Sequence, residues 1–80
     1  MTNLQQLLKE ACEMVENELK SGEIFMVRDL FRGFEWNRIP RGDRTRLGGM
    51  FFAYSQGDDG SKLVEPTDKT PQNQQRYRRR

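Results

Sequence analysis

The apolar positions of the first twenty residues recur at spacings of three and four. They are Leu4, Leu7, Leu8, Ala11, Met14, Val15 and Leu19. This spacing places them on one face of an amphipathic helix, which we predict over residues 3–21. Thr2 and Gln5 fit a capping box at its start, and Gly22 fits a left-handed cap at its end. The opposite face is acidic and therefore poorly suited to nucleic acid, so we expect this helix to be structural.

The next twenty residues change pattern several times. Residues 24–27 are rich in β-formers and predict either a brief strand or an extended connector. Residues 28–32 predict a short helix that Gly33 stops. The apolar residues between 34 and 39 suit either a one-turn helix or a hydrophobic turn, which Pro40 ends.

A third helix is predicted over residues 41–55. Asp43 lies in its first turn, where the helix dipole favours a carboxylate. One face gathers Leu47, Met50, Phe51 and Tyr54. Gly48 and Gly49 in the middle each cost about 1 kcal/mol relative to alanine. Either they permit close packing against the first helix, or they mark an early helix end, or they let a ligand approach the backbone closely.

The remaining residues predict a β-hairpin. Gly57–Gly60 is a loop signal, and a short strand follows over residues 63–65. The polar segment 67–73 joins it to a second strand over residues 74–80, in which Tyr77 is the only apolar anchor. The last three residues, 78–80, are basic and are candidates for a disordered tail.

This order of elements is that of a small winged helix-turn-helix. We therefore predict an α+β fold of three helices with a C-terminal β-hairpin wing, in a single domain over residues 1–80. A chain of this size buries roughly 60% of the surface that its unfolded form exposes, so its aromatic residues are needed inside. We expect Phe25, Phe31, Phe34, Trp36 and Phe51 in the core. Phe52 falls opposite the core face and predicts either packing under the wing or exposure.

Charge is segregated along the chain. The net charge is +2, but residues 1–23 carry −3, residues 24–56 carry +3 and residues 57–80 carry +2. All ten arginines follow position 27. Because the planar guanidinium suits phosphate and guanine edges, this favours a polyanionic partner. Against it, the net charge is low for a DNA-binding domain.

Several functional classes are excluded by composition. The chain has no histidine and one cysteine, Cys12, so it cannot build a zinc site from His and Cys ligands or a nucleophile–histidine pair. We expect no enzyme activity, no cofactor and no metal. A single cysteine forms no internal disulfide, which favours the cytoplasm. No apolar run is long enough for a membrane span or a signal peptide.

Two groups of residues are candidate DNA contacts. The first surrounds the start of the third helix and comprises Arg38, Arg41, Arg44, Thr45 and Arg46. Arginine paired with guanine is the commonest specific base contact. The second group lies on the hairpin and comprises Lys69, Gln72, Asn73, Arg76 and Arg78. Amides mixed with bases suit sugar and phosphate. The alternative for both groups is a solvated surface, with Arg44 paired to a nearby carboxylate.

The chain also resembles a family of short, uncharacterised bacterial and phage proteins with winged-helix-like architecture. The resemblance runs from Ile24 to Arg80. It is carried by Phe25, Arg28-Asp29-Leu30-Phe31, Trp36-Asn37, Gly42-Asp43-Arg44, Leu47-Gly48, Phe51, Val64-Glu65-Pro66, Asn73 and Gln75-Arg76-Tyr77. It implies the fold and no particular activity.

Order of elements and charge together predict a small double-stranded-DNA-binding protein, either a transcriptional regulator or an excisionase-like architectural factor. The third helix would enter the major groove and the wing would meet the backbone. The alternative is a protein-interaction module on the same fold, such as an inhibitor or adaptor from a phage or mobile element. The sequence specifies neither the DNA site nor the oligomeric state.

Overall fold

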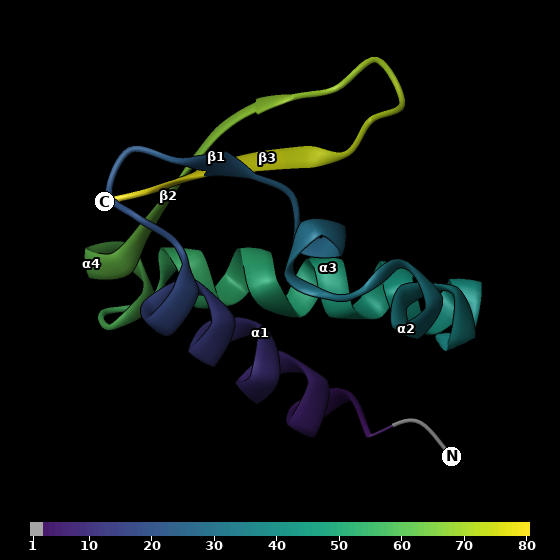
Figure 1. Cartoon of the computed structure of the whole chain (residues 1–80). Helices are drawn as coiled ribbons and strands as arrows, with labels where there is room; N and C mark the ends of the chain where they lie inside the picture. The colour runs from purple at the N-terminus through teal and green to yellow at the C-terminus, as the bar shows by residue number, and fades with distance from the viewer. Residues whose placement is uncertain (1–2) are drawn as a thin grey trace.

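The computed structural model describes residues 3–80, which form an α+β fold (Figure 1). Within these residues there are four α-helices, one 3₁₀ helix and a three-stranded antiparallel sheet. In chain order the elements are α1 (Leu4–Glu18), β1 (Ile24–Phe25), η1 (Val27–Leu30), α2 (Gly33–Arg38), α3 (Arg41–Gln56), α4 (Gly60–Leu63), β2 (Val64–Lys69) and β3 (Gln75–Arg79).

The first helix is confirmed, with its start capped by a different residue from the one predicted. The side chain of Asn3 accepts a hydrogen bond of 3.1 Å from the backbone N–H of Gln6. This satisfies one of the N–H groups that a helix start leaves without a partner. Thr2, to which we assigned the cap, lies outside the described residues.

The end of α1 differs from the prediction. The helix stops at Glu18, and the next residue is already extended. Gly22 has the expected positive φ of 90°, but it lies in the turn that leads to β1. There the N–H of Glu23 donates to the carbonyl of Lys20 at 3.1 Å. Gly22 thus supplies the left-handed residue of a tight turn, and its assignment as a helix cap was wrong.

For the segment between α1 and α3, the sequence left open whether residues 24–27 form a strand or a connector and whether residues 34–39 form a helix or a turn. Residues 24–25 form a strand, and residues 34–39 lie in or directly after the short helix α2. Gly33 was predicted to stop a helix and instead begins one. The backbone is extended at Phe31 and Arg32, so helical hydrogen bonding ends with η1 and starts again at Gly33.

Helix α3 was predicted almost to its last residue and runs without interruption through the two glycines. An early helix end at Gly48–Gly49 is therefore excluded. Leu47, Phe51 and Ser55 are its buried residues, one helical turn apart. The hydroxyl of Ser55 donates to the carbonyl of Phe52 at 2.6 Å, so no buried polar group is left without a partner there.

Helix α4 was not predicted, because its sequence carries a loop signal. Its first residue, Gly60, is buried against the end of α3. A Cβ atom at this position would collide with the carbonyl group of Tyr54. Glycine is required here because the two backbones pass too close for any side chain.

The hairpin is confirmed, and its second strand is the central strand of the sheet. The strand order is β1-β3-β2. Tyr77 of β3 pairs with Phe25 of β1 on one side and with Pro66 of β2 on the other. At the hairpin tip Asn73 adopts a φ of 65°, and its N–H donates to Thr70 at 2.8 Å. Asparagine tolerates this left-handed conformation better than most residues do.

The basic end of the chain is held by backbone hydrogen bonds to the turn before β1 and to the last residue of α4. The carbonyl of Arg79 accepts from the N–H of Gly22, and the N–H of Arg79 donates to Glu23. The N–H of Arg80 donates to Leu63 at 2.9 Å. Arg78 and Arg79, two of the three residues that we considered as a disordered tail, are thus part of β3, and Arg80 directly follows it.

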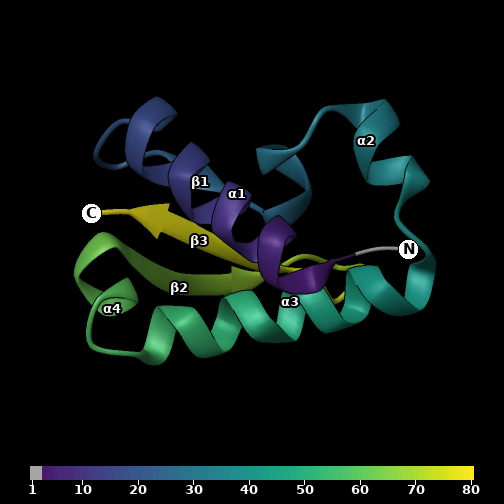
Figure 2. The same cartoon turned by 90° about the horizontal axis from the view of Figure 1, so that it is seen from below.

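Helices α1 and α3 cover one face of this sheet and enclose the core (Figure 2). The main cluster comprises Ala11, Val15, Phe25, Val27, Leu30, Leu47, Phe51, Val64 and Tyr77. Ring centroids are 5.7 Å apart between Phe25 and Tyr77, and 4.9 Å apart between Phe51 and Tyr77. Burial raises the pKa of Tyr77 to about 12.

The other predicted core aromatics are less buried. Phe31 and Trp36 are half-buried and pack on each other with centroids 5.9 Å apart. Phe34 is 51% exposed, so its assignment to the core was wrong. Phe52 is 39% exposed, which decides its alternatives in favour of exposure. Among the helices of residues 3–80, none has the length and apolar character needed to cross a membrane.

Adjacent phenylalanines test this core. We expect Phe51→Ala to lower the free energy of unfolding by about 3–5 kcal/mol, because it leaves a cavity between the sheet and α3. Phe52→Ala makes the same chemical change on the exposed side of the helix and should cost less than about 1 kcal/mol. Urea denaturation followed by circular dichroism measures both, and equal costs would contradict this orientation of α3.

Candidate nucleic-acid interface

A groove of about 690 Å³ lies between α3 and the β2–β3 hairpin. Figure 1 shows the hairpin projecting beyond the core, above the N-terminal half of α3. From α3 the groove is lined by Arg41, Arg44, Thr45, Gly48, Gly49 and Phe52. From the hairpin it is lined by Lys69, Asn73, Gln74, Gln75 and Tyr77, and its remaining lining comes from Met26, Val27, Arg28 and Trp36.

The lining carries charge of one sign only. Four of its residues are cationic and none is acidic: Arg28, Arg41, Arg44 and Lys69. They come from η1, α3 and β2, so the fold brings together bases that are up to 41 positions apart in the sequence. Positive charges along the walls of a concave surface reinforce one another and attract anions. We call this surface the cationic groove.

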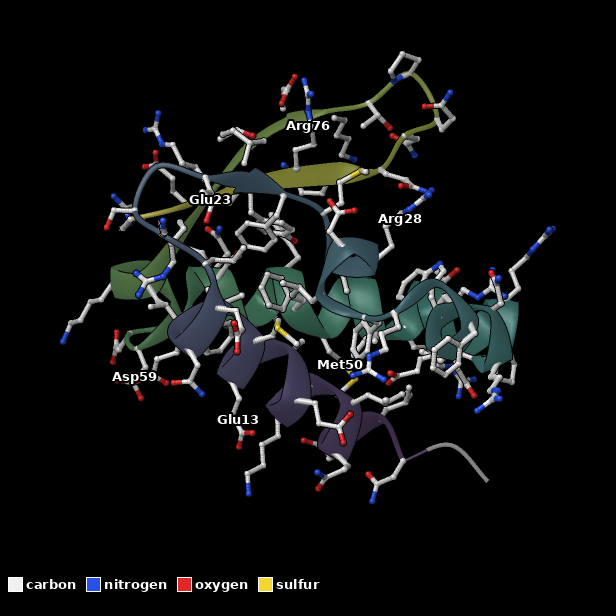
Figure 3. All side chains as sticks on the ribbon, in the orientation of Figure 1. Glu13, Glu23, Arg28, Met50, Asp59 and Arg76 are labelled. Carbon is white, nitrogen blue, oxygen red and sulfur yellow. The ribbon has the colours of Figure 1, made fainter. Side chains whose placement is uncertain are left out.

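The structure divides the predicted site residues into two sets of five. Those that line the cationic groove are Arg41, Arg44, Thr45, Lys69 and Asn73. Those that do not are Arg38, Arg46, Gln72, Arg76 and Arg78. Sequence reasoning missed Arg28, because it lies in the short η1 helix and only the tertiary fold brings it to the groove. Figure 3 shows Arg28 below the hairpin, on the side that faces α3.

The side chain of Arg44 links α3 to the end of α2. Its Nε donates to the carbonyl of Ile39 at 2.8 Å, and its Nη2 donates to the carbonyl of Asn37 at 3.2 Å. Its guanidinium carbon lies 5.8 Å from the centre of the Trp36 ring. Backbone carbonyls are therefore the partners of Arg44, where the sequence suggested a carboxylate. Two of its five N–H donors are therefore used inside the protein.

Two other bases near the start of α3, Arg38 and Arg46, lie outside the groove. Arg38, on α2, places its guanidinium carbon 5.0 Å from the centre of the exposed Phe34 ring. A contact of this kind at an exposed site contributes about 0.5–1 kcal/mol. Arg46 is exposed on α3 and is free of the groove lining. Thr45 lines the groove, and its hydroxyl donates to the carbonyl of Arg41 at 3.2 Å.

Arg76 and Arg78 point away from the core face on which Tyr77 lies, as alternation along a strand requires. Figure 3 shows Arg76 on the face of the hairpin turned away from α3. Arg76 forms a two-point ion pair with Asp68, with 2.9 Å between Nε and Oδ1. This pairing holds the pKa of Asp68 below its ordinary value.

Glu65 lies between the last arginines of the hairpin and pairs with two of them. It forms ion pairs with Arg78 and with Arg80, the latter at 3.1 Å. The positive charge of this hairpin face is thus largely compensated by Glu65 and Asp68, the two carboxylates of β2. The hairpin contributes to the cationic groove through Lys69 and through its tip.

A second groove, of about 510 Å³, is lined by four carboxylates and one arginine, and we call it the acidic groove. It is lined by Glu10, Glu13, Met14, Asn17, Glu18, Leu30, Phe31, Arg32 and Glu35, and shares no residue with the cationic groove. Helix α1 contributes three of its carboxylates and none of the residues of the cationic groove. Within residues 3–80, no cluster of three or more side chains offers ligands for a metal ion.

The chain belongs to the family described as a domain of unknown function (DUF1413), which matches residues 9–79. The match includes most of α1, so the resemblance found from the sequence, which started at Ile24, was too short on that side. No curated protein and no solved structure shows a significant match to this chain.

The contribution of the Arg44 side chain to the stability of the fold can be measured. We expect Arg44→Ala to lower the free energy of unfolding by about 1–2 kcal/mol, because it frees two carbonyls and one aromatic face. Arg41→Ala removes the same charge three residues earlier and should change stability by less than about 0.5 kcal/mol. Urea denaturation of the two variants checks this, and equal midpoints would show that these contacts of Arg44 contribute nothing to stability.

The ion pair on the outer hairpin face is tested by titration. Arg76→Ala should raise the pKa of Asp68 back towards 3.8, because the lowered value depends first on the guanidinium of Arg76. A lowered carboxyl pKa stabilises the fold at neutral pH, and this contribution disappears as the pH falls through that pKa.

NMR titration of the Asp68 carboxyl carbon gives the value directly. Arg78→Ala is the matched control, because it removes an arginine paired with Glu65 and should leave Asp68 unchanged. A shift of equal size in both variants would indicate a general charge effect and would exclude the specific pair.

Proposed function

We propose that this chain is a small double-stranded-DNA-binding protein, acting as a transcriptional regulator or an architectural factor. In this proposal α3 enters the major groove and the β2–β3 hairpin contacts the adjacent backbone as a wing. The protein binds and bends or marks DNA, and it performs no reaction.

The observation that carries the proposal is the cationic groove. A DNA strand presents a row of phosphates, and neutralising them releases counterions, which drives association. The groove offers four cations and no carboxylate on a chain whose net charge is only +2. Half of the chain's carboxylates are on α1 and on the outer face of the hairpin, and none of the twelve lines the groove. Segregation of charge, rather than its total, is what a DNA-binding surface needs.

The order and pairing of the elements also support a winged helix. A helix, a strand, short helices, a long helix and a hairpin follow one another, and β1 pairs with the last strand. Helices α2 and α3 are joined by only two residues, Ile39 and Pro40. A brief connection of this kind is typical of helix-turn-helix proteins, in which the second helix reads the major groove.

The exposed face of α3 suits close approach to base edges. It carries small residues at Gly42, Thr45 and Ala53. The major groove is about 12 Å wide and admits an α-helix, whose small residues let its backbone approach the base edges closely. Because two N–H groups of Arg44 are engaged by backbone carbonyls, we assign a base contact to Arg46, and phosphate contacts to Arg28, Arg41 and Lys69.

One feature favours the alternative of a protein-interaction module. The acidic groove combines four carboxylates with the partly exposed Met14 and with Phe31. A partner segment with basic and apolar residues would fit it. The two functions use different surfaces, so a protein contact at the acidic groove is compatible with DNA in the cationic groove.

The free cysteine supports a cytoplasmic location. Cys12 is half-buried on α1, and burial raises the pKa of its thiol. A free thiol with no disulfide partner in residues 3–80 is typical of a reducing compartment.

Duplex binding should depend steeply on salt. For roughly three phosphate contacts, the plot of log affinity against log salt should have a slope of about −3. Arg41→Ala combined with Lys69→Ala should weaken binding and make this slope shallower by about 2. Mobility shift on mixed-sequence duplex DNA at several salt concentrations measures both quantities.

Lys9→Ala combined with Lys62→Ala is the charge-matched control, because both lysines are exposed and outside the groove. It should leave the slope nearly unchanged. Absence of binding by the folded protein at low salt would overturn the proposal. An equal effect of the two double variants would show that net charge alone is responsible, and would remove the groove from it.

A further inference from the structure

Two consecutive glycines in the middle of α3 are unexplained by packing within the protein. A Cβ atom added to Gly48 or to Gly49 would meet no heavy atom within 4 Å. The prediction that these glycines permit close packing against the first helix was therefore wrong. Each still lowers helix stability by about 1 kcal/mol relative to alanine. The fold would be more stable with alanine at both positions.

These glycines lie in the lining of the cationic groove. Thr45 precedes them by about one helical turn and Phe52 follows them by about one turn, and both also line the groove. The facing wall is the hairpin, with Lys69 and Asn73 near its tip. The floor of the groove therefore includes bare helix backbone, with a partly exposed aromatic ring at one end and cationic side chains around it.

We infer that Gly48 and Gly49 form the contact at which a sugar-phosphate backbone lies directly on helix α3. The inference rests on the proposed DNA binding and assigns the position of one strand. Because glycine has no Cβ atom, a DNA strand can lie closer to the helix backbone at these two positions than it could at any other residue type. The phosphates on either side then reach Arg41 on one wall and Lys69 on the other.

Phe52 gives this contact a direction along the helix. It is 39% exposed although it is a large apolar residue, and it lies in the groove next to the glycines. An apolar ring at this place packs against a deoxyribose or a thymine methyl group, both of which are apolar parts of DNA. The strand therefore crosses α3 between the charged N-terminal turn, at Arg41, and Phe52.

The test separates stability from binding. Gly48→Ala combined with Gly49→Ala should raise the melting temperature, because alanine favours the helix. The same variant should weaken duplex binding by about tenfold or more, because two methyl groups occupy the place of the strand. Gly33→Ala is the matched control, since Gly33 is a helical residue at the start of α2, also has open space around it and is outside the groove lining.

The control should raise the melting temperature and leave the affinity within about twofold. The readouts are thermal melting and fluorescence anisotropy with a labelled duplex and, separately, with a labelled single strand of the same sequence. Normal duplex binding by the double glycine variant would overturn this inference and leave DNA binding by other residues intact. A loss confined to the single strand would also overturn it. Absence of duplex binding by the unchanged protein would overturn the proposed function itself.

Discussion

The packing of Tyr77 against Phe25 and Phe51 is the contact on which the rest of this small structure depends. Tyr77 lies in the central strand and is 1% exposed, and its ring touches one aromatic from β1 and one from α3. The three residues join the sheet, the connector after α1 and the long helix. So few residues leave no second core that could hold these parts together. The position of the hairpin over α3, and with it the groove, follows from this contact.

Helices whose apolar residues recur at regular spacing were predictable from the sequence. Elements that depend on contacts between residues distant in the sequence were not. The apolar face of α1 and the buried face of α3 can both be recognised from the spacing of apolar residues in the sequence. The hairpin was also predictable, since Tyr77 is the only apolar residue near the end of the chain. By contrast, α4 forms because Gly60 passes close to the carbonyl of Tyr54, and no local signal reports that approach.

The same distinction explains which site residues were found. Arg41, Thr45 and Lys69 were recognised because charge and helix position are local properties. Arg28 was missed because its place beside them depends on the fold. The roles of Arg44 and Arg76 changed because each has partners in the structure that composition cannot reveal: two backbone carbonyls for one and Asp68 for the other. Counting bases along a sequence overestimates the positive charge that remains available.

The central position of β3 has a consequence for how the protein is made. Strand β1 has its only described neighbour in a strand more than fifty residues later, and the side chain of Arg79 donates to the carbonyl of Val15 across 64 positions. Helix α1 can form as soon as it leaves the ribosome, because its hydrogen bonds are local. The sheet cannot, because its middle strand is translated after both of its neighbours. During synthesis β1 and β2 therefore have no strand partner until β3 emerges, and unpaired strand edges of this kind can pair with other chains.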